Sequence, residues 1–370
     1  MGLYIDSISC TDFRSYERFS LEDIGDLTLI VGPNAIGKTN LIEGIQLTTA
    51  FSSFRHPRAD HLIREGAQAA SFQSVIKGDG RLLKVKLLST NEGRSFYLNE
   101  KKKRAHTLRG ILPSVLFCPD DLDLIKGSQS IKRSQLDFLG TQLSPGYSAV
   151  RRDYEKILRQ KNSYLKQDTH HDYLVSINEV VASIGSQLYR MRAHIVASLL
   201  PYIQEYYAQL SSGKERVDIS YVPSWDRKTY DLERYHEIPQ VEREEASRIL
   251  YDAMERDHQK EHERHMSLHG PQVDRVEFYL NERNASTFAS QGQQRSLVLS
   301  YKMAEVAVIK DKLGQDPVLL LDDVMSELDN DRRAALLSLL SDGIQTFITA
   351  TNAESFNTDL LQRARLIELS

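Results

Sequence analysis

Eight residues near the N-terminus have the types and spacing of a phosphate-binding loop. They read G-P-N-A-I-G-K-T from Gly32 to Thr39, which fits the pattern G-x-x-x-x-G-K-[ST]. Glycine lets the backbone curl so that several N–H groups face one anion, and the helix that follows adds its positive N-terminal end. In such a loop Lys38 contacts the β- and γ-phosphates of a nucleotide, and the Thr39 hydroxyl binds Mg²⁺. The predicted nucleotide-binding residues are Gly32, Pro33, Asn34, Ala35, Ile36, Gly37, Lys38, Thr39 and Asn40.

Two carboxylates follow an apolar run far along the chain. Val318 to Leu321 reads as a buried strand and ends in Asp322 and Asp323. Ligands of open α/β sheets collect at the carboxyl ends of the strands. We expect Asp322 to hold Mg²⁺ and Asp323 to orient or deprotonate an attacking water. Together with Lys38 of the phosphate-binding loop, Asp323 is therefore a predicted catalytic residue. The alternative is that the two acids only end a strand and cap a helix.

A third motif opens a helix 32 residues before Asp322 and reads S-Q-G-Q-Q-R from Ser290. A serine and a glycine at a helix N-terminus form a second anion site. A head-to-tail dimer with nucleotide between its subunits would use both helix ends. We therefore expect Ser290, Gly292 and Gln293 to contact the nucleotide held by a second copy of the chain. The alternative is a plain N-cap, with Ser290 before Gln293.

The elements that must position these motifs alternate between strands and helices in the first and last thirds of the chain. Strands are expected at 27–31, 114–118, 318–321, 346–350 and 364–369, and helices at 40–50, 293–310 and 331–340. Segments 70–77 and 82–88 alternate as antiparallel strands do, and 94–99 is a possible third. The middle of the chain has long, charged helical patterns at 147–167, 173–209 and 240–265, and a lone strand at 217–222. The sequence predicts an α/β fold in which residues 1–120 and 268–370 form one domain and 121–267 form a mostly helical insertion.

Composition excludes several classes of protein. The 370-residue chain is 41% hydrophobic and 26% charged, which is ordinary for a globular protein and unlike a collagen, a disordered tail or a disulfide scaffold. Its two cysteines indicate a reducing compartment. No apolar run approaches the ~20 residues that span a bilayer, and no secretion signal is evident. We therefore expect a soluble, cytoplasmic protein with no membrane partner.

Two basic stretches are candidates for nucleic-acid contact. With a formal net charge of −4, any such contact must come from a local patch. Between 151 and 166 there are six basic residues, Lys161 among them, with Tyr154 interleaved; Arg152, Lys156 and Arg159 share helical spacing. The second stretch is Lys101, Lys102 and Lys103, followed by Arg104. The alternatives are a solvated helix face and a hairpin tip with solubilising charge. No pattern for reading bases is present.

Beyond these motifs, the sequence resembles the ATP-binding-cassette heads of the SMC class and, more closely, the RecF family of bacterial DNA replication and repair proteins. The segment D-F-R-S-Y from Asp12 is similar to the family's F-R-x-Y, and Ser53-Phe54-Arg55 to its S-F-R. Five longer segments also resemble the family: its phosphate loop at 32–45, an acidic segment at 117–137, its signature at 288–299, its second acidic motif at 319–329 and its final strand at 347–351. The match runs end to end and is weakest between about 165 and 265.

The resemblance implies a function. RecF-like proteins bind ATP, dimerise through it and hydrolyse it slowly, so the implied cofactors are ATP and Mg²⁺ and the implied activity is a weak, DNA-dependent ATPase. They bind double-stranded DNA, especially beside single-stranded gaps, and with RecO and RecR they help place RecA on gapped DNA in recombinational repair and the SOS response. Two alternatives remain: a different SMC-like head, and an ATP-binding scaffold without DNA clamp activity.

Several positions depart from the family's pattern. Gly44 stands where alanine is usual, which costs a helix interior about 1 kcal/mol. The family's G-P-H-R-D-D block reads G-P-Q-V-D-R at 270–275, so its His, Arg and last Asp are absent. Their absence puts in doubt the role of those polar groups, whether in supporting the site or in latching the domains together. Thr349 and Thr351 stand near the place where transporter cassettes carry a histidine, which fits slow hydrolysis.

Four further residues have competing interpretations. Arg14 and Arg55 are candidates for nucleotide contact, against a structural salt bridge. His262 and His265, with Glu263 nearby, suggest a metal site, but we expect only a charged surface helix, because no fourth ligand is evident.

Overall fold

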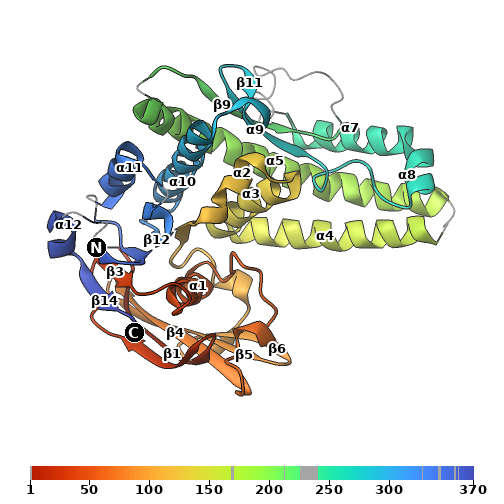
Figure 1. The fold of residues 1–370 in the computed structure, drawn as a ribbon. Coiled ribbons are helices and arrows are strands. Elements are labelled where there is room, and N and C mark those ends of the chain that lie inside the picture. The colour runs from red at the N-terminus through yellow and green to blue at the C-terminus, as the bar shows by residue number, and fades with distance from the viewer. Residues whose placement is uncertain are drawn as a thin grey trace. The chain divides into compact units, whose positions relative to one another are not determined.

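The computed structural model describes residues 2–167, 171–211, 213–225, 241–326, 328–340, 343–353, 356 and 358–370. The chain divides into two compact units (Figure 1). The first unit comprises Met1–Asp121 and Glu305–Ser370, and the second comprises Leu122–Ala304. Among the residues described, no helix is both long and apolar enough to cross a membrane.

A five-stranded parallel sheet in the order β14-β3-β13-β12-β8 lies in the first unit. Its strands are β3 Leu27–Val31, β8 Ser114–Phe117, β12 Val318–Asp322, β13 Thr346–Ala350 and β14 Arg365–Glu368. Every residue of β3, β8, β12 and β13 is buried, as expected of strands covered on both faces. The pairing of β12 with β13 ends at Asp322 opposite Thr349, and β13 pairs with β3 as far as Val31. The carboxyl ends of these three strands therefore lie side by side, and the predicted strands are confirmed.

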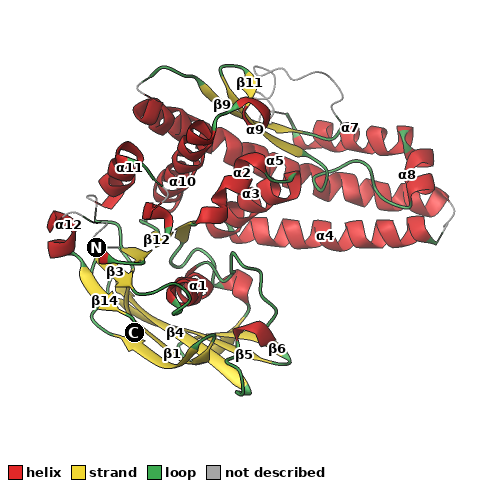
Figure 2. Ribbon diagram, viewed as in Figure 1, coloured by secondary structure: helices red, strands yellow, loops and turns green. Residues whose placement is uncertain are grey.

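A six-stranded antiparallel sheet in the order β2-β1-β4-β5-β6-β7 forms the rest of the first unit's sheet structure (Figure 2). Its strands are β1 Tyr4–Phe13, β2 Tyr16–Leu21, β4 Ala69–Gly78, β5 Arg81–Thr90, β6 Gly93–Leu98 and β7 Lys101–Lys103. One face packs against helix α1, Lys38–Thr49, through the fully buried Phe72. The possible strand at 94–99 is confirmed as β6.

Strand β7 was not predicted. The three lysines form an edge strand that pairs with β6, where a hairpin tip was one of the two interpretations of the sequence. The turn before it has positive φ at both Asn99 and Glu100, 47° and 68°, which is the geometry of a tight hairpin turn. This turn, rather than any hydrophobic alternation, starts the strand. The remaining helices of the first unit are α11 Asn330–Leu340 and α12 Thr358–Arg363.

Long helices dominate the second unit, and α4, α5 and α7 lie side by side in Figure 1. The helices are α2 Asp123–Lys126, α3 Gln129–Leu143, α4 Pro145–Lys166, α5 His171–Ser211, α7 Arg243–Arg256, α8 His258–Arg264, α9 Ala285–Phe288 and the part of α10, Gln291–Leu313, that ends at Ala304. A small sheet, in the order β11-β10-β9, contains β9 Val217–Val222, β10 Arg275–Leu280 and β11 Arg283–Asn284. The helical patterns at 147–167 and 173–209 and the strand at 217–222 are confirmed, and the pattern at 240–265 is two helices separated by Asp257.

The second domain boundary differs from the expected one at 267/268. The division by contacts falls within α10, between Ala304 and Glu305. Residues 268–304 group with the helices because β10 pairs with β9 along its whole length, from Arg275 opposite Val222 to Leu280 opposite Val217. A pairing between strands so far apart in sequence leaves no local signal.

Candidate nucleotide site

The predicted phosphate-binding loop connects β3 to α1. Gly37, immediately before the helix, has a φ of 118°, a conformation that is open to glycine. A Cβ there would also lie 2.6 Å from the Ser15 hydroxyl oxygen. Glycine is therefore required at this position on two counts. At a helix start the first N–H groups, here those of Lys38 and Thr39, have no acceptor within the helix and are open to an anion, whereas the Asn40 N–H already donates to the Gly37 carbonyl at 2.9 Å.

Lys38 is folded over this loop. Its side chain is buried, and Nζ donates to the carbonyl oxygens of Gly32, at 2.8 Å, and Pro33, at 3.1 Å. The ammonium is thus held beside the backbone that would surround a phosphate. This geometry fits the predicted contact between Lys38 and nucleotide phosphates.

Thr39 and Asp322 bring two oxygen ligands together at the end of the sheet. The Thr39 hydroxyl donates to Oδ1 of Asp322 at 3.0 Å, across 283 positions of sequence. Burial raises the pKa of Asp322 above its usual value, hydrogen bonds from Thr349 and Thr39 oppose the rise, and the neighbouring charge of Asp323 adds to it. A hydroxyl and a carboxylate side by side are the hard oxygen ligands that Mg²⁺ prefers. The predicted ligand pair fits that ion.

The second acid leaves the strand in an unusual backbone conformation. Asp323 has a φ of 53°, in the left-handed region, and its N–H donates to Oγ1 of Thr349 at 2.9 Å. The same Thr349 hydroxyl donates to Oδ1 of Asp322 at 2.8 Å. One buried threonine therefore contacts both acids.

A buried glutamate organises the N-terminal motifs beside the loop. Glu43, fully buried on α1, accepts two 3.0 Å hydrogen bonds from Arg14 and one of 2.6 Å from Ser53. Arg55 lies 3.6 Å from the same carboxylate and donates to Oδ1 of Asn40 at 3.0 Å. Both arginines therefore pair with Glu43, as the salt-bridge alternative expects. Glu43 was not predicted from the sequence; an acid inside an otherwise apolar helix pattern is the signal that could have found it.

The signature motif lies in the second unit and forms a reciprocal cap at the start of α10. The Ser290 N–H donates to Oε1 of Gln293 at 2.7 Å, and the Gln293 N–H donates to the Ser290 hydroxyl at 3.3 Å. The Gln293 amide also donates to Glu215. These contacts are those of the N-cap alternative within one chain. Contact of Ser290, Gly292 and Gln293 with a partner's nucleotide stays a prediction.

The altered block at 270–275 stabilises the second unit. Asp274 is fully buried and accepts hydrogen bonds from the Tyr221 hydroxyl, at 2.8 Å, and the Ser224 N–H, at 2.7 Å. Arg192 donates to the Pro271 carbonyl at 2.6 Å and makes a bidentate ion pair with Asp137 at 2.8 and 2.9 Å. Asp274 and the Pro271 carbonyl are therefore paired inside this unit.

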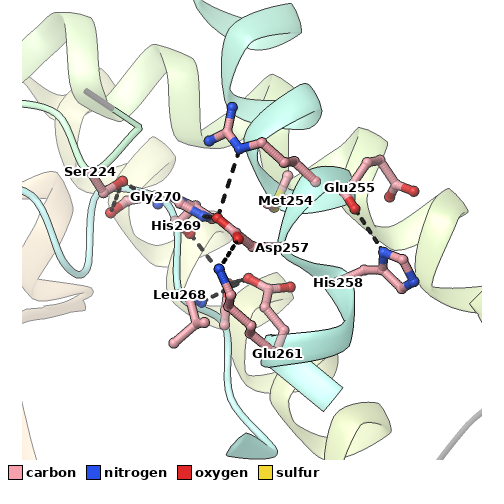
Figure 3. Close-up of polar contacts among 12 residues, drawn as sticks. Ser224, Met254, Glu255, Asp257, His258, Glu261, Leu268, His269 and Gly270 are labelled. Atoms are coloured by element: carbon pink, nitrogen blue, oxygen red, sulfur yellow. Dashed lines mark hydrogen bonds and ion pairs between the residues drawn. The ribbon is translucent and has the colours of Figure 1, made fainter. Parts of the chain in front are cut away.

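A second polar cluster connects α8 to the chain just before that block (Figure 3). Asp257 pairs with Nε2 of His269 at 2.8 Å, and Glu261 accepts from the Leu268 N–H at 2.7 Å. Glu261 also pairs with Lys161 of α4 at 2.6 Å, and both side chains are almost completely buried. These contacts hold the loop against the helices.

The burial of Lys161 corrects the interpretation of the basic stretch on α4. Lys161 and Tyr154 face the interior, so they cannot contact DNA on an exposed surface. Arg152, Lys156 and Arg159 are exposed, as their shared spacing predicted. Helix α4 packs against α5, α3 and α8, and this packing determines which of its basic residues remain outside, which helical spacing alone did not reveal.

The other two predictions concern exposed residues. All three lysines of β7, Lys101–Lys103, are exposed. His262 and His265 lie with ring centroids 6.4 Å apart, and Nδ1 of His265 is 3.0 Å from the Leu165 carbonyl oxygen. Within the described part of the chain, no group of three or more His, Cys, Asp or Glu side chains is arranged to hold a metal ion.

Comparison with known proteins identifies the family. Residues 4–365 match the family described as RecF/RecN/SMC N terminal domain. Over 99% of its length the chain is 33% identical to the DNA replication and repair protein RecF of Staphylococcus carnosus, of which it covers 98%. It is 32% identical to the RecF of Staphylococcus epidermidis, with the same coverage.

Solved structures agree with this assignment. Two structures of the recombination mediator protein RecF in the RecFOR pathway, described as RecF-ATPrS and RecF-ATP, superpose with TM-scores of 0.87 and 0.84 at 26% and 27% identity. Each comparison covers 96% of this chain and 94% of the other. A Pyrococcus furiosus Smc head domain, with a TM-score of 0.53 and 15% identity over 99% of this chain and 93% of that one, shares the fold. The chain, an α/β head with a mostly helical second unit, belongs to the RecF family of SMC-type ATPase heads.

Proposed function

We propose that this protein is an ATP-gated DNA-binding protein of DNA replication and recombinational repair, and a slow, DNA-dependent ATPase. The observation that carries the proposal is the meeting of Lys38, Thr39 and Asp322 at one sheet edge, in a chain related to RecF proteins over its whole length. The solved relatives described with ATP and ATPrS support ATP as the nucleotide.

The residues of the first unit have distinct parts in the proposed reaction. The backbone of 32–40 and the Lys38 ammonium hold the phosphates. Thr39 and Asp322 would hold Mg²⁺, which would neutralise charge that develops on the phosphates. Asp323 orients the attacking water and accepts its proton. Hydrolysis then returns the protein to the state without ATP.

Dimerisation couples the nucleotide to the second unit. Ser290, Gly292 and Gln293 contact the γ-phosphate held by Lys38 of the partner subunit. The helix end and the capping serine supply N–H groups and a hydroxyl for that contact. A dimer therefore assembles only while the γ-phosphate is present, and Asp323 sets its lifetime.

DNA binds through exposed basic residues, independently of sequence. On α4 the candidates are Arg152, Lys156 and Arg159, each of which is exposed. On the antiparallel sheet Lys102 lies opposite Tyr97, and Tyr97 lies opposite Lys86, so cationic side chains continue inward from the edge strand. Lysines on an edge strand can also serve to prevent the sheet from pairing edge to edge with another sheet. That role does not account for Lys86, which lies on an interior strand. Such contacts to phosphates weaken strongly with salt.

The partners follow from the pathway in which the solved relatives are described. We extend the proposal to RecR and RecO as protein partners, to the loading of RecA on gapped DNA during the SOS response, and to action in the cytoplasm. The occupants of the DNA site are double-stranded DNA and the adjoining single-stranded gap.

Sedimentation velocity with and without ATP and Mg²⁺ tests the nucleotide gate. We expect the wild type to dimerise in ATP and to return to monomer as ATP is consumed, Lys38→Met to stay monomeric, and Asp323→Asn to stay dimeric. The control Lys312→Met changes an exposed lysine of α10 and should behave as the wild type.

Three results would change the proposal. If Lys38→Met dimerises normally in ATP, the loop is not the gate. If Asp323→Asn disperses as fast as the wild type, Asp323 is not the base. If wild-type dimers form in ATP without any hydrolysis, the protein is an ATP-binding scaffold.

A further inference from the structure

A single hydroxyl connects the two acids of the nucleotide site. Thr349 is fully buried on β13, where it lies opposite Asp322 of β12 in the parallel sheet. Its Oγ1 is 2.8 Å from Oδ1 of Asp322 and 2.9 Å from the backbone nitrogen of Asp323. The carbonyl oxygen of Leu321, at 3.5 Å, is at the limit of hydrogen bonding.

The direction of these hydrogen bonds follows from the chemistry of the groups. An amide N–H only donates, so Thr349 accepts from Asp323. Its one hydroxyl proton is then donated to the nearer of its two possible acceptors, which is the Asp322 carboxylate and not the Leu321 carbonyl. Oδ1 of Asp322 also receives the Thr39 hydroxyl at 3.0 Å. Two threonines from opposite ends of the sequence therefore fix the orientation of this carboxylate.

The same hydroxyl fixes the point at which the chain leaves the sheet. The pairing of β12 with β13 ends at Asp322, and the next N–H, that of Asp323, donates to the Thr349 side chain. Asp323 adopts a φ of 53°, which is strained for a residue other than glycine. The bond from Thr349 stabilises this turn, and the turn sets the direction in which the Asp323 side chain projects.

We propose that Thr349 is a positioning residue for ATP hydrolysis, which orients Asp322 toward Mg²⁺ and fixes the backbone turn that carries Asp323. This inference rests on the proposed function above. Burial on a strand of this sheet does not by itself give a threonine hydroxyl hydrogen-bond partners. Thr28 is also fully buried, on neighbouring β3, and the described residues provide no hydrogen-bond partner for its hydroxyl.

Three variants separate positioning from packing. Thr349→Val keeps the shape and removes both hydrogen bonds, Thr349→Ser keeps the hydroxyl, and Thr28→Val removes an unpartnered hydroxyl from the adjacent strand. We expect Thr349→Val to hydrolyse ATP about 10- to 100-fold more slowly, the range found when groups that orient metal ligands are removed. We expect KM for ATP to stay within about threefold, because the phosphate loop is intact. Thr349→Ser and Thr28→Val should stay within about threefold of the wild-type rate.

Two further readouts do not depend on turnover. The Mg²⁺ concentration that gives half-maximal binding of a fluorescent ATP analogue should rise several-fold in Thr349→Val and remain unchanged in Thr28→Val. Without nucleotide, hydrogen exchange of the Asp323 amide should accelerate in Thr349→Val and recover in Thr349→Ser. The exchange measurement tests the contact even if the wild type proves not to hydrolyse ATP, so failure of this inference and failure of the proposed function are distinguishable.

Several outcomes would overturn the inference. Wild-type hydrolysis and Mg²⁺ requirement in a folded Thr349→Val protein would do so, as would equal losses in Thr349→Val and Thr28→Val. A thermal melt checks that each variant is folded. If Thr349→Val does not fold, Thr349→Ala takes its place, and failure of Thr349→Ser to exceed Thr349→Ala in rate would equally exclude a role for the hydroxyl.

Discussion

The glycine in the middle of α1 predicts an unusual response to a common helix-stabilising change. Alanine is about 1 kcal/mol more favourable than glycine in a helix interior. A Cβ at Gly44, however, would lie 2.1 Å from Cε2 and 2.3 Å from Cδ2 of Phe72. Carbon atoms in contact are normally ~3.5–4.0 Å apart. The helix and the ring cannot both keep their present positions.

The ring has little room to move. Phe72 is fully buried and packs edge-on against Phe13, with ring centroids 5.3 Å apart. Overpacking a core costs about 1–3 kcal/mol. After the helix gain of about 1 kcal/mol is subtracted, we expect Gly44→Ala to lower the free energy of unfolding of the first unit by up to about 2 kcal/mol.

A double-mutant cycle tests this reasoning. Phe72→Val removes the ring atoms that collide, so in that background Gly44→Ala should raise the free energy of unfolding by about 1 kcal/mol. Urea unfolding followed by circular dichroism measures both changes. The single tryptophan, Trp225, lies in the second unit, so its fluorescence midpoint should not change. Stabilisation by Gly44→Ala in the wild type, or the same effect in both backgrounds, would refute the argument.

Two other predictions concern the second unit and the DNA surface. Burial would raise the pKa of Asp137, but the ion pair and hydrogen bonds with Arg192 outweigh burial and hold the pKa below its usual value. The stability that the ionised Asp137 contributes is therefore present above the unfolded pKa of ~3.9 and is lost as pH falls through the folded pKa. Asp137→Asn should therefore cost about 3 kcal/mol near pH 7 and less below about pH 4, as followed by Trp225 fluorescence in urea; an equal cost at pH 7 and pH 3 would contradict the ion-pair account. For DNA, Arg159→Ala and Lys102→Ala test the two surfaces separately, and each lost phosphate contact should reduce the slope of log affinity against log salt by about 0.9. An unchanged slope in both variants would exclude both surfaces.

Much of the first unit could be predicted because its signals are local. Continuous apolar runs such as 318–321 indicate strands that are buried on both faces, and the loop pattern at Gly32–Thr39 combines a strand, a turn and a helix in one stretch. The position of Asp322 at the end of β12, and of Asp323 directly after it, could be predicted because the carboxyl ends of parallel strands meet at one edge.

The features that sequence analysis missed depend on distant partners. Lys161 looks like any other lysine of a charged helix until α8 brings Glu261 against it. Strand β10 groups with the helices because it pairs with β9, more than 50 positions earlier. Glu43 is buried only because Arg14 and Ser53, from different segments, converge on it. Thr349 was noted for its place in the sequence, but its contacts with both acids follow from strand register.

The most direct test of the central claim is binding of gapped duplex DNA, with and without ATP, at two salt concentrations, by wild-type protein and Lys38→Met. We expect binding by the wild type that requires ATP, weakens at the higher salt and disappears in Lys38→Met. Equal binding in all states, or binding in none, would contradict a link between the nucleotide site and DNA.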